Sequence, residues 1–528
     1  MHCNGRLLAK VVAALALIVV AEILIGDGNG AVVGGFAFAW LAALGLTRRA
    51  IWGNGSARVA MIAAAVLALA LVDDPSFVGW VMFWLSLSLA VLLPRQGFDD
   101  ALAWVRRLVW HAVLGIVAPL ADAASIGMVG QRRGRSASSM RSVGAVVALP
   151  LIGGAVFLAL FASANPVIGR AFSLIVLPDM WSVTWRALFG LAVLITIWAS
   201  LRPRAGTTRP SRYGRGTING AFEPGVATLI LSLVTFNVIF AVENALDIVF
   251  LWSGAGLPAG VSMADYAHRG AYSLIVTAVL AGVFVLLALR PGSAGAASSL
   301  VRRLVTVWIV QNLLLVASSA LRTLDYVDVY GMTVWRLSAL AWMGLVATGL
   351  ALIGWRLLAR KTAAWLINAN AMAGVAVLAT ASVVDLAATA AAWNARTAIA
   401  EGVHSPSLDL CYMGQLGTSS LVSLALLERH VRNPDLRDRL AYLRWTNRNA
   451  LVEMQSDWRS WTPRNARRLA TVDAILGGKA PRLRPALDGR DCGGAIMIPV
   501  PPAPNPTPAP PPPPPPTPPK PLTTGAQR

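Results

Sequence analysis

Long apolar runs alternate with short polar linkers from residue 7 to residue 392. Runs near 20 residues are typical of transmembrane helices, because the hydrocarbon core is about 30 Å thick and a helix rises about 1.5 Å per residue. Lipid leaves backbone groups no partner outside the segment, and runs of this length favour helices over a closed barrel. The pattern predicts an all-α polytopic transmembrane bundle. About eleven spans are expected, near residues 7–25, 31–46, 57–72, 76–93, 143–163, 184–201, 226–252, 271–289, 304–320, 334–358 and 363–392.

The segment over residues 98–120 has a different pattern. Acidic, basic and tryptophan side chains recur through it at helical spacing. Such a helix suits the interface between lipid and water better than the hydrocarbon core. We predict an interfacial helix here; the alternative is a further crossing, which would move the arginine-rich 131–135 linker to the other side.

The linkers alternate in charge, and this predicts an orientation. Arginines concentrate in the linkers after the second, fourth and sixth spans, whereas the linkers 73–75 and 325–328 are acidic. Basic linkers stay in the cytoplasm. The expected orientation has the N-terminus in the cytoplasm and everything after Trp393 on the extracytoplasmic side.

Composition agrees with a membrane protein. Of the 528 residues, 56% are hydrophobic and 13% are charged. With a mean hydropathy of +0.62, this excludes an ordinary soluble enzyme. The net charge of +20 would suggest nucleic acid in a soluble protein, but the membrane orientation accounts for it. The expected partner is the lipid bilayer, and no nucleic acid is expected.

The C-terminal part divides into two. Residues 393–490 predict a small helical extracytoplasmic domain, with helix starts at Ser407, at Asn433 followed by Pro434, and at Thr462 followed by Pro463. Residues 491–528 form a proline-rich tail that we expect to be a disordered, stiff spacer. The alternative is that the tail and the domain bind an envelope protein or a cell-wall partner.

Cysteines and catalytic motifs add little chemistry. Cys411 and Cys492 both fall in the predicted external domain and are candidates for a disulfide, whereas Cys3 is alone. The chain has no zinc-finger spacing, phosphate-binding glycine loop, dinucleotide fingerprint, zinc helix or nucleophilic serine motif. We expect no metal and no cofactor, and an enzyme is the less favoured interpretation.

Polar residues inside the 226–252 run are the main candidate site. Glu243 and Asp247 lie one helical turn apart, and a carboxylate in hydrocarbon is costly unless it has a partner or a function. Two explanations are open: buried ion pairs that fix helix register, or a polar cavity for a proton, an ion or a small anionic solute. The candidate cluster comprises Asn237, Glu243, Asn244, Asp247, Tyr266, His268, Arg269, Gln311, Asn312, Arg322, Asp325, Arg336 and Asp385.

Several short motifs resemble a known family. They are Asn244-Ala-Leu-Asp-Ile-Val-Phe-Leu-Trp252, Tyr266-Ala-His-Arg-Gly-Ala-Tyr272, Asn394-Ala-Arg396, Leu408-Asp-Leu-Cys-Tyr412 and Asp457-Trp-Arg-Ser-Trp461. Over about residues 225–475 the chain resembles bacterial membrane proteins catalogued as domain of unknown function 4173, related to 4153. The resemblance implies a multi-pass protein of the bacterial inner (cytoplasmic) membrane with an extracytoplasmic C-terminal part, and it implies no activity.

Three functions follow as hypotheses. The first is a non-enzymatic envelope scaffold, sensing or regulatory component. The second is a transporter or ion-coupled carrier with a pocket around Glu243 and Asp247. The third is a membrane enzyme acting on lipid or glycan precursors, with Asp265 and Asp328 among its acidic groups. No ligand and no oligomeric state are predicted.

Overall fold

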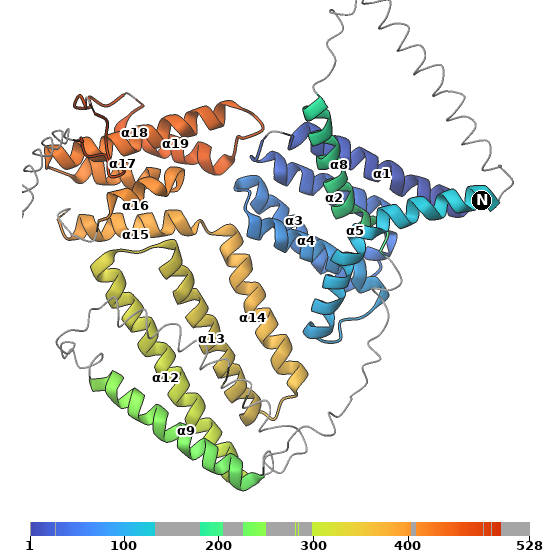
Figure 1. The fold of residues 1–528 in the computed structure, drawn as a ribbon, viewed down its shortest axis with the longest axis horizontal. Helices are drawn as coiled ribbons and strands as arrows, with labels where there is room; N and C mark the ends of the chain where they lie inside the picture. Colours follow the sequence, from blue (N-terminus) through green and yellow to red (C-terminus); the bar gives the residue numbers. More distant parts are fainter. Residues whose placement is uncertain are drawn as a thin grey trace, which may run out of the picture.

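The computed structural model describes residues 2–132 except 27, 180–203, 225–249, 280, 284, 298–402, and 408–497 except 479 and 487. These residues form helices and no strand, so the all-α prediction is confirmed (Figure 1). Eight of the described helices are long and apolar enough to cross a membrane. The predicted span at 143–163, most of that at 271–289, and the proline-rich stretch after residue 497 lie outside the described residues.

The first group of membrane helices packs around aromatic side chains. Trp40 and Phe83 are fully buried, with ring centroids 5.8 Å apart. Asn54 and Ser76 accept hydrogen bonds from helix N–H groups and so fix where two of the helices begin. The group comprises α1 (His2–Leu24), α2 (Val32–Thr47), α3 (Gly55–Asp73), α4 (Phe77–Leu92) and α8 (Met180–Leu201).

The second group lies beside the first in Figure 1. It comprises α9 (Val226–Asp247), α12 (Ser299–Tyr330), α13 (Val334–Leu358) and α14 (Ala363–Val383). The helix α12 is longer than the span predicted at 304–320, and the expected acidic turn at 325–328 is helical. The physical reason is that no helix-breaking residue occurs before Gly331, where φ reaches +76°.

The span predicted at 363–392 is two helices. The first, α14, ends at Val383, and α15 (Leu386–Ala400) follows after a short extended break. Asp385 causes the break, because its carboxylate accepts the Ala388 N–H at 2.9 Å and so caps the new helix. Asp385 therefore lies at a helix end and is not part of a membrane-embedded cluster.

The helix α15 packs with the C-terminal helices. Ala391 and Ala395 on α15 share a buried core with Leu424 and Leu427 on α17. We call α15–α19 the C-terminal unit. Its further elements are α16 (Leu410–Gln415), η5 (Gly417–Ser420), α17 (Leu421–His430), α18 (Pro434–Ser456) and α19 (Pro463–Leu476).

Two of the three helix starts predicted for this unit are observed as N-caps. Asn433 caps α18 by accepting the Asp435 N–H at 2.8 Å, and Thr462 caps α19 by accepting the Asn465 N–H at 3.3 Å. Ser407 lies outside the described residues, and Asp409 caps α16. The unit covers one end of the membrane helices, which we call the domain side (Figure 1).

The helix α5 (Ala101–Arg132) contacts the ends of two membrane helices on the opposite side. Its first N–H, of Ala101, donates to Asn368 Oδ1 near the start of α14 at 2.8 Å. Further along, Asp122 accepts from Trp198 Nε1 near the end of α8 at 2.9 Å. Residues 101–119 have the length and hydropathy to cross a membrane, but these contacts join helix ends on one side and favour an interfacial helix.

Spin labels test this placement. Leu102, Val109 and Ile116 are exposed, and their heptad spacing puts them on one face of α5. We expect labels at the three positions to have similar oxygen accessibility in bilayers. Val59 and Val66 on α3 serve as the control pair for a crossing helix and should differ in depth. A clear accessibility maximum at residue 109 would mean that α5 crosses the membrane.

Candidate functional site

The helices α9 and α12 are joined by amide hydrogen bonds. Asn237 Nδ2 donates to Leu304 O at 3.1 Å, and Asn244 Nδ2 donates to Gln311 O at 3.3 Å. The two partners in each bond are 67 residues apart, so the helices run parallel and in register. Inside a membrane, where apolar side chains give little preference for one register, such bonds fix the alignment of two helices.

An ion pair closes the same seam. The guanidinium of Arg322 binds the Asp247 carboxylate, and its Nη2 lies 4.0 Å from Glu243 Oε1. The Asp247 side chain is 3% exposed, whereas that of Glu243 is 53% exposed. Asp247 is therefore the carboxylate that depends on Arg322, because a buried charge without a counter-ion is strongly destabilising.

Two further predicted residues, Asn312 and Arg336, make their hydrogen bonds elsewhere. Asn312 donates to Trp308 O of its own helix. Arg336 donates to Tyr330 O at 3.0 Å and lies over the Tyr326 ring at 4.2 Å, so it caps the end of α12. Asp325 lies on α12. Tyr266, His268 and Arg269 lie outside the described residues.

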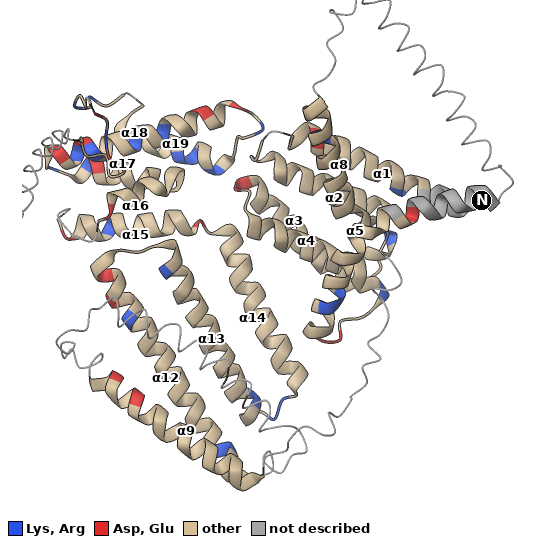
Figure 2. Cartoon of the chain, viewed as in Figure 1, with Lys and Arg blue, Asp and Glu red and all other residues tan. Residues whose placement is uncertain are grey.

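A second cluster joins α19 to the ends of the membrane helices. Arg464 Nε lies 3.0 Å from Asp73 Oδ2, and its Nη1 lies 2.7 Å from Asp74 Oδ2. Arg464 also donates to Val383 O at the end of α14, at 2.7 Å. Arg467 pairs with Asp73 as well. Figure 2 shows the acidic end of α3 facing basic residues of α19. One helix face thus binds two membrane hairpins.

Asp385 belongs to this second cluster. It pairs with Arg468 and accepts the Ser419 hydroxyl at 2.9 Å. Burial alone would raise the pKa of the Asp385 carboxyl, but the Ala388 N–H and the Arg468 charge more than offset burial and hold that pKa below its ordinary value. Burial raises the pKa of Asp74 despite the nearby Arg464. The ionised form of Asp385 therefore stabilises the contact.

The loop between α1 and α2 docks through its backbone. Gly30 N donates to Arg459 O at 2.7 Å, and Ala31 N donates to Trp461 O at 2.8 Å. A Cβ on Gly30 would lie 2.5 Å from Ser460 C, so only glycine allows this close approach. The 459–461 segment thus contacts the first membrane hairpin.

The turn between α12 and α13 docks on the C-terminal unit in a similar way. The Asn394 amide accepts from Met332 N at 2.6 Å and donates to Met332 O at 2.9 Å. The Tyr412 hydroxyl accepts the Val334 N–H at 2.8 Å. Asn394 replaces both hydrogen bonds that a neighbouring backbone would supply, which holds the turn at a defined position.

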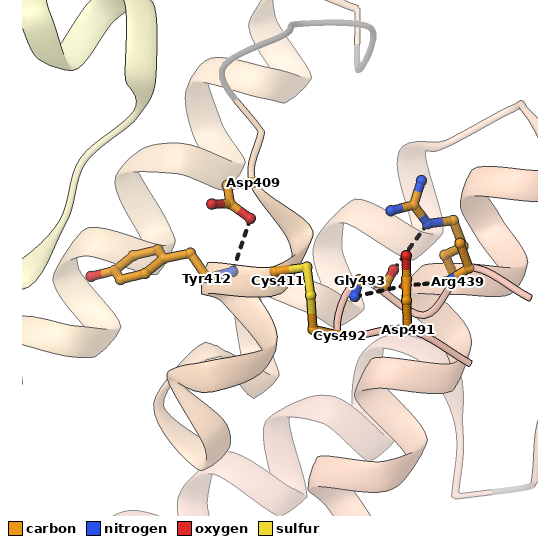
Figure 3. The surroundings of a disulfide bond; sticks show 8 residues. Asp409, Cys411, Tyr412, Arg439, Asp491, Cys492 and Gly493 are labelled. Atoms are coloured by element: carbon orange, nitrogen blue, oxygen red, sulfur yellow. Dashed lines mark hydrogen bonds between the residues drawn. A yellow bond between two sulfur atoms is a disulfide. The ribbon is translucent and has the colours of Figure 1, made fainter. Parts of the chain in front are cut away.

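A disulfide fixes the last described segment of the unit. Cys411 on α16 is bonded to Cys492, with their Cα atoms 4.8 Å apart (Figure 3). Arg439 Nε donates to Gly493 O at 2.9 Å, and Arg490 pairs with Asp438 at 2.6 Å. The chain is therefore attached to α16 and α18 just before the proline-rich segment begins.

The family is decided by a match over most of the chain. Residues 59–427 match the family described as domain of unknown function (DUF4153). The chain belongs to the DUF4153 family. No curated protein and no solved structure matches it.

The family match covers part of the docking interface of this DUF4153 protein. It includes Asp73, Asp385, Asn394 and Tyr412, and it begins further toward the N-terminus than the resemblance over 225–475 suggested. It ends within α17, so the 457–461 motif and the arginines of α19 lie beyond it. The DUF4153 region thus contains the acidic partners of α19, whereas the Gly30 loop and the arginines of α19 lie outside it.

Sequence reasoning missed this interface. Asp73 and Asp74 were expected only to mark an outer linker, and the 457–461 motif only to mark a family. The available signal was the spacing of Arg464, Arg467 and Arg468, which puts three cations on one helix face. Finding their partners required the three-dimensional arrangement of the helix ends.

The described residues offer little for other chemistry. None of their His, Cys, Asp and Glu side chains form a group of three or more that could hold a metal ion. One cavity, of about 330 Å³, lies between α4, α5 and α8; a groove of about 700 Å³ lies between α2 and α3. Neither is lined by a residue of the predicted polar cluster.

A glycine substitution tests the docked loop. Gly30→Ala should destabilise the docked state by roughly 1–3 kcal/mol, because the added methyl group overlaps the 459–461 backbone. The measurement is release of the C-terminal unit by limited proteolysis of the detergent-solubilised chain. Gly35→Ala is the matched control, since its Cβ would meet only Leu24, at 3.8 Å. Equal protease resistance of the two variants would contradict the docking.

Acidification tests the Asp385 contact. Because the pKa of Asp385 is lowered in the folded protein, its stabilising contribution is present above the ordinary carboxyl range, near pH 4, and is lost as pH falls through the lowered value. Asp385→Asn should therefore speed hydrogen exchange of α19 at pH 7, and the difference from wild type should shrink as the pH falls below about 4. An undiminished difference at pH 3 would rule out this titration.

Proposed function

We propose that this DUF4153 protein is a non-enzymatic scaffold of the bacterial inner membrane. In this proposal the helical bundle anchors the C-terminal unit on the outer face, and the unit presents the proline-rich tail to an envelope or cell-wall partner. The observation that carries the proposal is the set of contacts from Arg464 of α19: ion pairs with Asp73 and Asp74 at the end of α3, and a hydrogen bond to Val383 O at the end of α14. They attach the unit firmly to its membrane anchor.

The distribution of charge supports the orientation. The helix ends on the domain side carry Asp73, Asp74 and Asp385, and the opposite ends carry Arg48, Arg49 and Arg58. An excess of arginine marks cytoplasmic linkers. A disulfide also suits a compartment outside the cytoplasm. Both features favour a cytoplasmic N-terminus and an external C-terminal unit. The relation to family 4173 is part of the same proposal.

The polar seam between α9 and α12 fits a scaffold better than a carrier. A carrier needs a carboxylate that is free to exchange its cation or proton. Here Asp247 is bound to Arg322, and the asparagines bond to backbone carbonyls of the neighbouring helix. We infer that this seam sets helix register.

Complementation in a strain with an envelope phenotype tests the scaffold. Loss of residues 498–528 should remove function as completely as loss of the whole chain, because the partner-binding part is gone. Asp247→Asn, compared at matched protein level, should complement, since an amide can still accept from Arg322. A well-folded but inactive Asp247→Asn protein would overturn the scaffold in favour of a carrier.

An alkaline phosphatase fused after residue 497 tests the orientation. The fusion should be active, because the C-terminal unit is proposed to lie outside the cytoplasm, and an inactive fusion would overturn the orientation.

A further inference from the structure

An apolar groove runs between α2 and α3, toward the side opposite the C-terminal unit. Its volume is about 700 Å³, within the roughly 300–1,000 Å³ range of small-molecule sites. Phe38 and Ile62 line it and are 40% and 65% exposed, so the groove opens sideways from the helix pair. In a bilayer that direction faces acyl chains. Its other apolar walls are formed by Leu41, Ala42, Leu46, Met61 and Ala65.

Trp52 and Arg58 form the end of this groove. The Trp52 indole N–H donates to Gly45 O at 3.0 Å, and a Cβ on Gly45 would lie 3.3 Å from the indole, so the missing side chain lets the ring lie against α2. The order from apolar wall to tryptophan to arginine matches the order from acyl chain to interface to headgroup in a membrane. Arg58 is exposed at the headgroup end.

The charge at this end has no internal counter-ion. Within the described part of the chain, Arg48, Arg49 and Arg58 form no ion pair, and no acidic residue lines the groove. Arg48 has a structural task, because its guanidinium donates to Leu201 O at the end of α8. The Arg58 guanidinium makes no hydrogen bond with a described residue. The cation that borders the groove is thus available to an anion from outside.

We propose that this groove binds one anionic phospholipid. One acyl chain lies along the apolar walls between α2 and α3, and the phosphate of the headgroup pairs with Arg58, beside Trp52. An apolar protein helix could cover the apolar walls but would leave the Arg58 guanidinium without a counter-ion. An anionic lipid has an acyl chain for the walls and a negative charge for Arg58. Basic sites between transmembrane helices recognise anionic headgroups through the same combination of charge and apolar contact.

Native mass spectrometry of the full chain tests the proposal. The probes are phosphatidylglycerol and phosphatidylethanolamine with identical acyl chains, supplied as an equimolar mixture. Wild type should retain phosphatidylglycerol preferentially. Arg58→Gln should lower that preference about fivefold, the factor that one basic side chain contributes near an anionic surface. Arg49→Gln is the matched control, because Arg49 is also exposed at this end but does not line the groove.

A second variant tests the acyl-chain part. Ala42 is exposed on the groove wall, so Ala42→Phe should fold normally and fill the space. It should reduce retention of both lipids while leaving the melting temperature unchanged. An unchanged headgroup preference in Arg58→Gln, an equal loss in Arg49→Gln, or full lipid retention in Ala42→Phe would each overturn the site.

Discussion

The contact of α19 with the acidic ends of the membrane helices is the interaction on which the rest of the arrangement depends. Arg464 reaches α3, its following linker and the end of α14 at once. Membrane helices gain little from apolar contact with one another, because lipid offers the same contact. Charged and backbone hydrogen bonds at their ends can therefore determine how separate hairpins sit together.

The C-terminal unit uses three kinds of contact for this purpose. Arginine side chains of α19 form ion pairs with the end of α3 and a hydrogen bond with the last carbonyl of α14. Backbone carbonyls of the 459–461 segment accept the Gly30 and Ala31 N–H groups, and the Asn394 amide binds the turn after α12. Each contact gives a hydrogen-bond or ionic partner to polar groups at the end of a membrane helix. A buried polar group without such a partner would destabilise the fold. Together they connect the two groups of membrane helices through one external body, and the disulfide at Cys492 continues this firm attachment to the start of the tail.

Much of the fold could be predicted from hydrophobic periodicity. Helices such as α2, α3 and α13 match their predicted ranges within a few residues, because apolar length and capping residues act locally. The break at Asp385 was missed, since Ala-rich sequence on both sides continues the apolar pattern and only a single cap interrupts it. Asp247 and Arg322 were both in the candidate cluster, because charged residues are rare on apolar helices. The sequence did not show that they pair with each other.

The docking interface could not be predicted in the same way. Gly30 and Arg459 are far apart in the sequence, and neither reveals its partner through spacing or composition. Their contact depends on the positions of several helix ends, which follow from tertiary packing. The role of the 457–461 motif, whose backbone carbonyls bind the loop between α1 and α2, became visible only in the three-dimensional arrangement of these helix ends. The docking interface therefore depends on tertiary packing more than on local sequence patterns.

The most direct test is a distance between the two bodies in a membrane. Spin labels at Phe77 on α4 and Ala470 on α19, both exposed, can be measured by double electron–electron resonance in nanodiscs. A firmly docked unit predicts one narrow distance distribution at pH 7, and a broad one when Arg464→Glu and Arg468→Glu are combined. A broad distribution in the otherwise unchanged chain would contradict the central claim that α19 holds the C-terminal unit on the membrane helices.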